Sequence, residues 1–386
     1  MLENRLPPKG ARVLVGMSGG VDSSVSAALL VEHGCIVEGG FIKNWSDSVD
    51  LWTGECQWRG ERRDAIRVAA KLGIPLHTFD FEETYRARVI DRMFAEYADG
   101  ITPNPDVLCN EEIKFGLFFE KAKELGFDYI ATGHYARLRE DEDGQTYLLK
   151  GADENKDQTY FLHRVSQEAL RQSVFPIGHL QKNEVRDLAK KFELPTAQKP
   201  DSQGICFVGK IDFHDFLRKK NKAQPGDIVD KDGKKLGKHD GLDAYTIGQR
   251  HGLLVTSESK SWYVAKKNIK KNELIIVNDR EDPLMYSSEA LLRNTHWISR
   301  TPTSVGAGGS EGPGDDSERV EVKCAIRYRQ TPMTCSIKKQ GDYWHIVFAE
   351  PVWALAPGQS AVLYKDDECL GGGFMEDLSV DSQHEE

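Results

Sequence analysis

The sequence predicts an α/β protein in which a doubly wound parallel-sheet domain is followed by a small central domain and a C-terminal β-barrel. Three observations lead to this class. The chain has 386 residues, more than one ordinary domain of roughly 100–200 residues. Its first two hundred residues alternate short β-branched runs with helix-like patterns. Its last hundred read as short antiparallel strands separated by turn signals.

The first domain is expected to span residues 1–221. Strand-like runs at 11–17, 37–42, 75–81 and 128–135 alternate with apolar-periodic helical segments, as in a parallel sheet covered on both faces. Glycines that suit the left-handed conformation of a helix C-cap follow three of these segments, at Gly34, Gly73 and Gly126.

Two further domains are expected after this one. Residues 222–284 contain short segments broken by turn signals and predict a small basic central domain. Residues 285–376 predict an antiparallel β-barrel with a flexible Gly/Ser/Asp-rich loop at 303–318. We expect the tail, 377–386, to be disordered.

Composition places the chain among folded, non-membrane proteins. Apolar residues make up 39% and charged residues 29%, and no apolar run approaches the roughly 18 residues of a membrane helix. The N-terminus, MLENRLPPKG, has neither an apolar signal core nor an Arg/Ser-rich presequence. We therefore expect a cytoplasmic protein without a membrane partner.

The charge distribution permits a nucleic-acid partner although the net charge is −10. Residues 210–280 carry 16 Lys/Arg against 10 Asp/Glu, so the middle of the chain is locally positive. Such runs are more often solvated surface than binding sites. One hypothesis is that four of these lysines contact RNA phosphates, namely Lys266, Lys267, Lys270 and Lys271.

Cysteine usage argues against a disulfide framework and against a metal cluster. The seven cysteines include no CxxC pair, so cysteine chemistry would involve isolated thiols. Four lie in apolar settings or beside a glycine run and are interpreted as packing residues: Cys35, Cys324, Cys335 and Cys369. Cys56 is assigned no role.

The strongest local motif is SGGVDSS at residues 18–24, which lies between the first predicted strand and an apolar-periodic helix. Its two glycines allow a tight turn close to an oxyanion, and the helix N-terminus offers free N–H groups and a positive dipole end. The loop lacks the GK[ST] ending of a Walker A motif, which disfavours a kinase or motor. We interpret it as a pyrophosphate-binding loop.

Two other motifs present isolated thiols. TPNPDVLCNEEIKF, residues 102–115, carries Asp106 and Cys109 in a proline-containing loop, before a helix that we expect to begin near Glu111. A thiol near a helix N-terminus has a lowered pKa, so Cys109 is a candidate nucleophile and Asp106 a candidate proton carrier. KPDSQGICFVG, residues 199–209, carries Cys206 in a glycine-containing turn. Taken alone, a cysteine in either setting is more often a structural residue than a nucleophile.

The SGGVDSS loop resembles that of the PP-loop ATP pyrophosphatases, which have an adenine nucleotide alpha-hydrolase-like fold and adenylate a substrate oxygen. With GHYARL at 133, NKDQTYFL at 155, RYRQ at 327 and PGQ at 357, the chain resembles more specifically the tRNA-specific 2-thiouridylases. The resemblance runs from about Val13 to Gly373. It implies that ATP, with Mg²⁺, adenylates the C2 oxygen of the wobble uridine in the anticodon stem-loop of tRNA. A persulfide sulfur then displaces AMP.

The resemblance also implies roles for individual residues. Cys206 matches the cysteine that receives sulfur from a persulfide donor protein, Cys109 the partner thiol that closes a disulfide with it, and Asp106 the acid/base residue. The positions implied to line the ATP site are Gly16, Met17, Ser18, Gly19, Gly20, Val21, Asp22, Ser23, Ile42 and Gly133, with Asp22 near Mg²⁺. Those implied to contact tRNA are Asn104, Pro105, Asp106, His134, Lys156, Asp157, Gln158, Arg327, Tyr328 and Gln359.

Two other functions are considered from the residues alone. A different PP-loop ligase acting on a small metabolite would share the phosphate loop but would have no use for two isolated thiols in Pro- and Gly-shaped segments. A non-catalytic RNA-binding protein that retains a decayed phosphate loop would release no pyrophosphate from ATP, and the intact SGGVDSS, Asp106 and both cysteines argue against such decay. An assay of pyrophosphate release with ATP and tRNA separates these classes.

Overall fold

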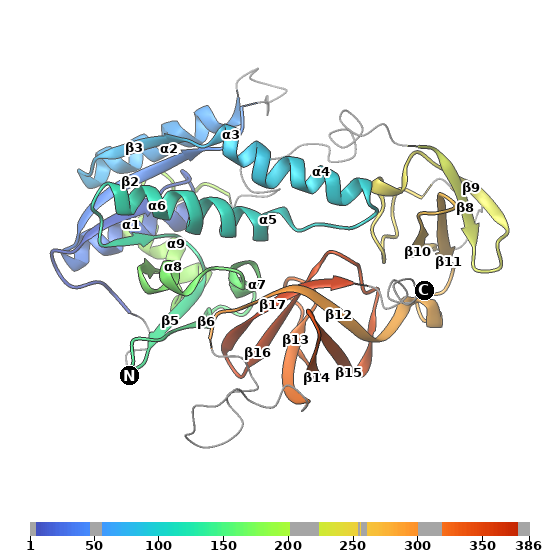
Figure 1. Cartoon of the computed structure of the whole chain (residues 1–386). Coiled ribbons are helices and arrows are strands. Elements are labelled where there is room, and N and C mark those ends of the chain that lie inside the picture. The colour runs from blue at the N-terminus through green and yellow to red at the C-terminus, as the bar shows by residue number, and fades with distance from the viewer. Residues whose placement is uncertain are drawn as a thin grey trace.

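The computed structural model describes residues 5–46, 56–200, 224–253, 255, 261–299 and 319–376. Its first domain is built on a five-stranded parallel sheet, as the sequence predicts (Figure 1). The strand order is β3-β2-β1-β4-β7. The strands are β1 (Arg12–Gly16), β2 (Ile36–Lys43), β3 (Leu76–Asp80), β4 (Tyr129–Ala131) and β7 (Ser173–Val174).

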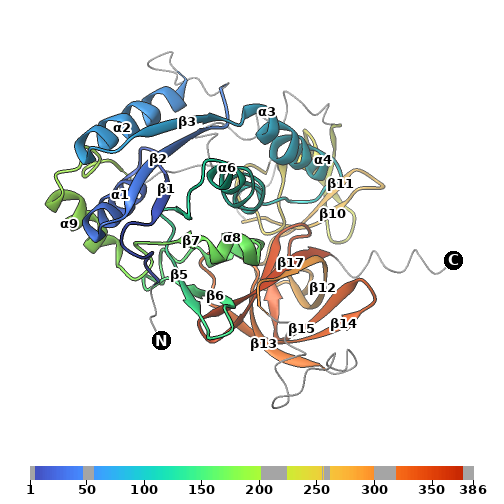
Figure 2. The same ribbon diagram turned by 60° about the vertical axis from the view of Figure 1, so that its left-hand side comes forward.

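Helices cover both faces of this sheet (Figure 2). On β1, Val13 and Val15 belong to one apolar cluster, and Leu14 between them belongs to another. This alternation follows from the period of two residues along a strand. The first cluster includes residues of α1 (Val21–His33), α2 (Gln57–Leu72) and α9 (Lys182–Lys191). The second includes residues of α4 (Asp91–Ala98), α6 (Phe118–Glu124), α7 (Thr159–Leu162) and α8 (Gln167–Arg171).

Glycines end two of these helices in the way the sequence predicts. Gly34 and Gly73 are the C-caps of α1 and α2, with φ of 96° and 68°. Gly126 also has a positive φ, 75°, and lies two residues beyond α6. The left-handed conformation at these positions is one that glycine adopts without steric cost.

The segment that carries Cys109 is helical from an earlier residue than expected. α5 (Pro105–Leu108) continues without a break into a π-helix, η2 (Cys109–Leu117), and then into α6. The prediction of a helix start near Glu111 is therefore wrong. Asn104 is the N-cap, since its side chain accepts a hydrogen bond from the Val107 amide at 3.4 Å, and Pro105 occupies the first helical position, where a missing N–H costs nothing.

The middle of the chain forms a four-stranded sheet in the order β10-β11-β8-β9. Its strands are β8 (Gly226–Asp230), β9 (Lys235–His239), β10 (Tyr263–Asn268) and β11 (Glu273–Val277), and a 3-10 turn, η3 (Leu242–Ala244), lies between β9 and β10. Six buried residues form a small core of its own: Ile228, Leu242, Tyr245, Val264, Leu274 and Ile276.

The C-terminal residues form a closed six-stranded β-barrel, which confirms the predicted architecture. The order β12-β15-β14-β13-β16-β17 closes through the pairing of β12 with β17. The strands are β12 (Tyr286–Trp297), β13 (Val320–Ala325), β14 (Met333–Gln340), β15 (Tyr343–Trp353), β16 (Ser360–Lys365) and β17 (Glu368–Glu376). The expected loop at 303–318 and the expected tail at 377–386 lie outside the described residues.

Two strands of the first domain extend the barrel's sheet. β5 (Ala136–Glu140) and β6 (Thr146–Lys150) form a hairpin, and β6 pairs with β17 through Leu148 and Leu149. No local sequence pattern indicates this pairing, because the two strands are more than two hundred residues apart in the chain. The pairing joins the barrel to the hairpin that directly follows residues 133–135, which we call the GHY segment. In the described ranges, no helix has the length and apolarity needed to cross a membrane.

Candidate active site

The phosphate loop joins the end of β1 to the start of α1, as its sequence predicts. Gly19 has a φ of 71°, and a Cβ at this position would lie 2.2 Å from the carbonyl oxygen of Glu61 in α2. Gly20, the N-cap of α1, would place a Cβ 3.3 Å from the Ser18 hydroxyl. Gly19 is therefore required by both backbone conformation and close packing, whereas Gly20 is the less constrained of the two.

Hydroxyl groups stabilise the turn from inside. Ser23 Oγ accepts a hydrogen bond from the Ser18 amide at 3.3 Å and donates to the Gly20 carbonyl at 3.3 Å. Ser24 Oγ donates to the same carbonyl at 2.6 Å, and the Met17 amide donates to Gly40 on β2 at 2.9 Å. Side chains of the loop and a main-chain bond to β2 therefore hold the turn in this shape.

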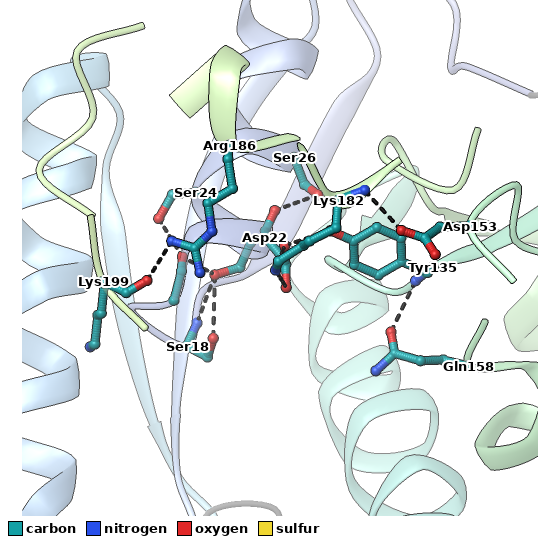
Figure 3. A network of polar contacts seen from close by, with 12 residues as sticks. Ser18, Asp22, Ser24, Ser26, Tyr135, Asp153, Gln158, Lys182, Arg186 and Lys199 are labelled. Atoms are coloured by element: carbon teal, nitrogen blue, oxygen red, sulfur yellow. Dashed lines mark hydrogen bonds and ion pairs between the residues drawn. The ribbon is translucent and has the colours of Figure 1, made fainter. Parts of the chain in front are cut away.

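Asp22 lies in the first turn of α1 and has two side-chain partners that the sequence analysis did not identify (Figure 3). The Tyr135 hydroxyl donates to its Oδ1 at 2.9 Å, and Lys182 Nζ donates to Oδ1 at 2.7 Å and to Oδ2 at 2.9 Å. Lys182 begins α9, where the helix dipole disfavours a cation. Because a lysine is unfavourable at a helix N-terminus, Lys182 could have indicated from the sequence that an acidic partner lies nearby in the fold.

A second lysine contacts the main chain of the loop. Lys199 Nζ donates to the Gly19 carbonyl at 2.9 Å and to Asp64 Oδ2 of α2 at 2.6 Å. Arg186 Nη1 donates to the Lys199 carbonyl at 2.6 Å, which fixes the backbone from which this lysine extends. Burial raises the pKa of nearby Glu61, opposed by the charge of Lys199. The phosphate loop is thus supported from α2 and from the segment after α9.

The other positions assigned to the ATP site surround this loop. Gly133 packs against the first turn of α1, since a Cβ there would lie 2.7 Å from the Ser23 amide nitrogen. Ile42 lies on β2, and its side chain is buried in the core. Gly16 ends β1, and Val21 begins α1. All of these assigned positions occur at the carboxyl ends of strands or at the first turn of α1, where open α/β sheets bind nucleotides.

The GHY segment connects the phosphate loop to the helix of Cys109. His134 is buried, its Nδ1 lies 2.7 Å from the Thr132 hydroxyl, and its Nε2 lies 3.5 Å from Lys114 Nζ on η2. Burial, and secondarily the Lys114 charge, hold the His134 pKa well below its usual value, so the imidazole is neutral at pH 7. His134 can contact RNA only as a neutral hydrogen-bonding group.

The NKDQ segment packs against the other side of Tyr135. Gln158 Oε1 accepts from the Tyr135 amide at 3.0 Å, and the Gln158 amide donates to the Tyr135 carbonyl at 3.0 Å. Asp157 accepts from the Gly151 amide at 2.9 Å and from the Thr159 hydroxyl at 2.8 Å, and burial raises its pKa. Asp157 therefore shapes this turn, and the partly buried Lys156 beside it carries the positive charge.

Asn104, Pro105 and Asp106 form the N-terminal cap and first turn of one helix, and Cys109 lies in its second turn. Cys109 is fully buried and belongs to the same apolar cluster as Phe115 and Phe118. Its π-helical segment is an uncommon geometry that occurs preferentially at functional sites. Cys206 lies outside the described residues, so its position relative to Cys109 stays a prediction.

The barrel residues assigned to tRNA contact lie next to this helix. Tyr328 packs on Phe161 with ring centroids 4.5 Å apart, and Asn110 of η2 donates to the Phe161 carbonyl at 3.2 Å. Gln359 Nε2 donates to the carbonyls of Thr102 and Pro103, at 3.0 and 3.2 Å. Arg327 is partly buried and donates to a barrel carbonyl, that of Ala354, at 2.5 Å.

The remaining cysteines divide into two groups. Cys324, Cys335 and Cys369 are buried in apolar clusters, which confirms their interpretation as packing residues. Cys35 is only partly buried, but it packs against the apolar cluster of α1 and α2, as its interpretation as a packing residue expects. Cys56 is the N-cap residue of α2, and its thiol lies 3.0 Å from the Ser46 carbonyl. The structure suggests no chemical role for either of these two.

Comparison with known proteins finds a family model for each of the three domains. Three family models match in succession: the tRNA methyl transferase HUP domain over residues 11–210, the tRNA methyl transferase PRC-barrel domain over 214–278 and the aminomethyltransferase beta-barrel domain over 287–375. A solved 4-thiouridine synthetase–RNA complex with bound ATP is 15% identical and covers 52% of this chain and 46% of its own, with a TM-score of 0.33. A likeness of that size carries no argument about function.

Curated relatives match over nearly the whole chain. The tRNA-specific 2-thiouridylase MnmA of Pseudomonas fluorescens is 47% identical over 369 residues, which cover 95% of this chain and 94% of the relative. The enzyme of the same name from Bacillus licheniformis is 45% identical over 377 residues, covering 97% and 98%. That of Bacillus subtilis is 44% identical, covering 97% of each chain. The chain belongs to the tRNA-specific 2-thiouridylase family.

Proposed function

We propose that this chain transfers sulfur to C2 of the wobble uridine of tRNA, with the phosphate loop binding ATP and with Cys206 and Cys109 handling the sulfur. The observation that carries the proposal is the contact chain between separate motifs. Asp22 of the phosphate loop contacts Tyr135, which is bonded to Gln158, and neighbouring His134 contacts Lys114 on the Cys109 helix. A nucleotide and a nucleobase bound at these motifs would be neighbours.

The phosphate loop supports the first half-reaction. The α1 N-terminus and the glycine turn attract a pyrophosphate group, and Lys182 neutralises the carboxylate of Asp22, which would otherwise repel it. Asp22 offers the oxygen ligands that Mg²⁺ prefers, and Mg²⁺ bound there would reduce the charge of the phosphates. In this step the uridine O2 attacks the α-phosphorus, a P–O bond forms, and pyrophosphate leaves.

The second half-reaction requires sulfur that has already been loaded. The terminal sulfur of a Cys206 persulfide attacks C2, the C2–O bond breaks, and AMP leaves with the bonding electrons. The Cys109 thiolate then attacks the sulfur of Cys206, the S–S bond to the transferred sulfur breaks, and that sulfur stays on the base. A disulfide between Cys109 and Cys206 remains, which an external thiol must reduce before the next cycle.

Asp106 is proposed to move protons at the base. It lies in the first turn of the helix, three residues before Cys109, so the two side chains share one face of the helix start. Asn104 and Pro105 would border the base on the same turn. Cys109 is fully buried, so the proposed disulfide requires the Cys206 side chain to pack directly against it at that stage.

Two partners complete the proposal. A protein that carries a persulfide would load Cys206, and the anticodon stem-loop of tRNA would be held by the NKDQ segment and by Arg327 and Tyr328 of the barrel. A positive potential near these residues is needed because phosphate contacts dominate RNA affinity.

The test uses unmodified tRNA incubated with the full chain, ATP, Mg²⁺ and a sulfide source, followed by mass spectrometry of its nucleosides. We expect 2-thiouridine at the wobble position, one pyrophosphate released per thiolation, and none without ATP. A methylated nucleoside instead, or pyrophosphate release that needs a small metabolite and not tRNA, would contradict the proposal. The second of these results would favour a ligase of small metabolites.

A further inference from the structure

The residues before the Asn104 cap are held by two other domains. We call Gly100–Pro103, between α4 and α5, the clamped segment. In Figure 1 the chain between these helices runs to the side on which the middle sheet and the barrel lie. Because Asn104 and Asp106 follow directly, any shift of this segment moves the first turn of the helix that carries Asp106 and Cys109.

The middle domain contacts the clamped segment at its first residue. Lys267 on β10 donates from Nζ to the Gly100 carbonyl at 3.1 Å. Gly100 has a φ of 75°, and a Cβ there would lie 2.3 Å from Cδ1 of Ile269. The positive φ favours glycine at this position, and a side chain there would also have to displace the half-exposed Ile269 side chain. This contact overturns the hypothesis that Lys267 is one of the phosphate-binding lysines.

The ammonium group of Lys267 loses hydration in this position, which is unfavourable for its charged form. Burial lowers the pKa of its ammonium group to about 8, only partly opposed by the negative charge of Asp243 on η3. A buried ammonium is unfavourable unless its interactions compensate for lost hydration. Lys234, on the turn between β8 and β9 of the same domain, is exposed by comparison.

The barrel holds the other end of the clamped segment. The Thr102 amide donates to the Pro357 carbonyl at 2.9 Å, and Gln359 Nε2 donates to the Thr102 and Pro103 carbonyls. Gly358 has a φ of 87°, and a Cβ there would lie 2.1 Å from Ile101 Cγ2 and 3.0 Å from the Thr102 carbonyl oxygen. Successive main-chain groups of the segment are therefore engaged by the barrel.

We infer that the middle domain is a positioning element for the sulfur-transfer step, and that Lys267 is its positioning residue. The hydrogen bond to Gly100 anchors one end of the clamped segment while Pro357 and Gln359 anchor the other, and the helix start carrying Asp106 is built on that fixed base. Lys267 touches neither base nor nucleotide; it acts through the segment. This inference deepens the proposed function and rests on the role proposed there for Asp106.

The test compares Lys267→Met with Lys234→Met, which makes the same chemical change on an exposed lysine of the same domain. In Lys267→Met we expect kcat for tRNA thiolation to fall at least tenfold, while the KM for tRNA and the affinity for ATP stay within about twofold of wild type. The denaturant midpoint at pH 7.5 should stay equal or rise, because a buried charge is removed. Lys234→Met should match wild type in kcat and midpoint.

A second readout does not depend on activity. The amides of Val107 and Leu108 are protected by Asn104, through its side chain and its carbonyl respectively. Hydrogen exchange at these two amides should be faster in Lys267→Met than in wild type or in Lys234→Met. Absence of thiolation in wild type would overturn the proposed function itself. With wild type active, an unchanged kcat and unchanged exchange in Lys267→Met would overturn the inference, as would a loss of kcat that merely follows a lowered denaturant midpoint.

Discussion

The phosphate loop and the Cys109 helix reach their geometry in different ways. The turn between β1 and α1 is shaped mainly by hydroxyls and glycines within a few residues of one another, such as Ser23 and Gly20. The helix start at Asn104 depends on partners far away in the chain, Lys267 and Gln359 among them. Contacts within a short motif make up most of the proposed phosphate site, whereas contacts among three domains hold the helix start that we propose for sulfur chemistry.

The largest expected effect tests how local the phosphate loop is. Gly19→Ala would force a side chain into a left-handed conformation and against the Glu61 carbonyl, at a cost of about 2–4 kcal/mol. We expect a lower free energy of unfolding and at least a tenfold loss of ATP affinity. Gly20→Ala, the matched control, should change the free energy of unfolding by much less. Equal destabilisation by both variants, measured by urea unfolding, would mean that contact with α2 does not constrain the turn.

Lys182→Met tests one of the long-range contacts of the phosphate loop, the ion pair with Asp22. Removing the ammonium leaves the partly buried Asp22 carboxylate with the Tyr135 hydroxyl but without the positive charge of Lys182 beside the proposed phosphate site, which should weaken ATP binding by about 2 kcal/mol. The control is Lys190→Met in the same helix, whose exposed pair with Asp187 should contribute little. The readout is the ATP dissociation constant from calorimetry. An unchanged constant in Lys182→Met would show that Asp22 needs no neutralising partner.

The sequence predicts the features of this molecule that depend on local contacts better than those that depend on long-range contacts. The parallel sheet, the barrel and the SGGVDSS turn were predictable because strand alternation, helix periodicity and glycine placement are local. The partners of Asp22, namely Tyr135 and Lys182, were not, since neither lies near it in the chain. The start of the Cys109 helix was misplaced because two prolines suggested a loop, whereas Asn104 and Pro105 instead serve as its N-cap and first helical residue.

Lys267 was misassigned for a related reason. In the sequence it is one lysine of a basic run, and nothing in that run separates it from exposed Lys266. Only the packing of β10 against the clamped segment reveals that its ammonium faces the Gly100 carbonyl. Composition can indicate a charged region, but it cannot indicate which member of the region turns inward.

The pH dependence of stability should expose the buried charge of Lys267. Its pKa is about 8 in the folded protein and near 10.5 when unperturbed, so between these values the unfolded chain binds more protons and the free energy of unfolding rises with pH. Relative to Lys267→Met, wild type should therefore gain about 1–2 kcal/mol between pH 7.5 and 10. Urea unfolding of both proteins across this range is the measurement. A difference independent of pH would contradict the assigned pKa.

A smaller effect concerns the exposed lysines of the middle domain. If Lys266, Lys270 and Lys271 contact RNA phosphates, their joint replacement by Gln should flatten the slope of log affinity against log salt by about 0.7–0.9 per lost contact. Replacement of Lys267 alone should leave the slope unchanged, because its ammonium is bonded to Gly100. Titrations of tRNA at several salt concentrations give both slopes. A triple variant with the wild-type slope would show that these three lysines are solvated surface.

The central claim, that two thiols handle the sulfur in turn, is tested by peptide mapping under non-reducing conditions after a single turnover without reductant. Cα atoms joined by a disulfide lie within about 7 Å of each other, so Cys206 must reach the buried Cys109 at that stage. We predict a linked peptide containing Cys109 and Cys206 in amounts that match the thiouridine formed. We also predict a Cys109→Ser variant that accepts labelled sulfur on Cys206 but does not pass it to tRNA. Thiouridine formed in full yield without the linked peptide, or by Cys109→Ser at the wild-type rate, would contradict the account.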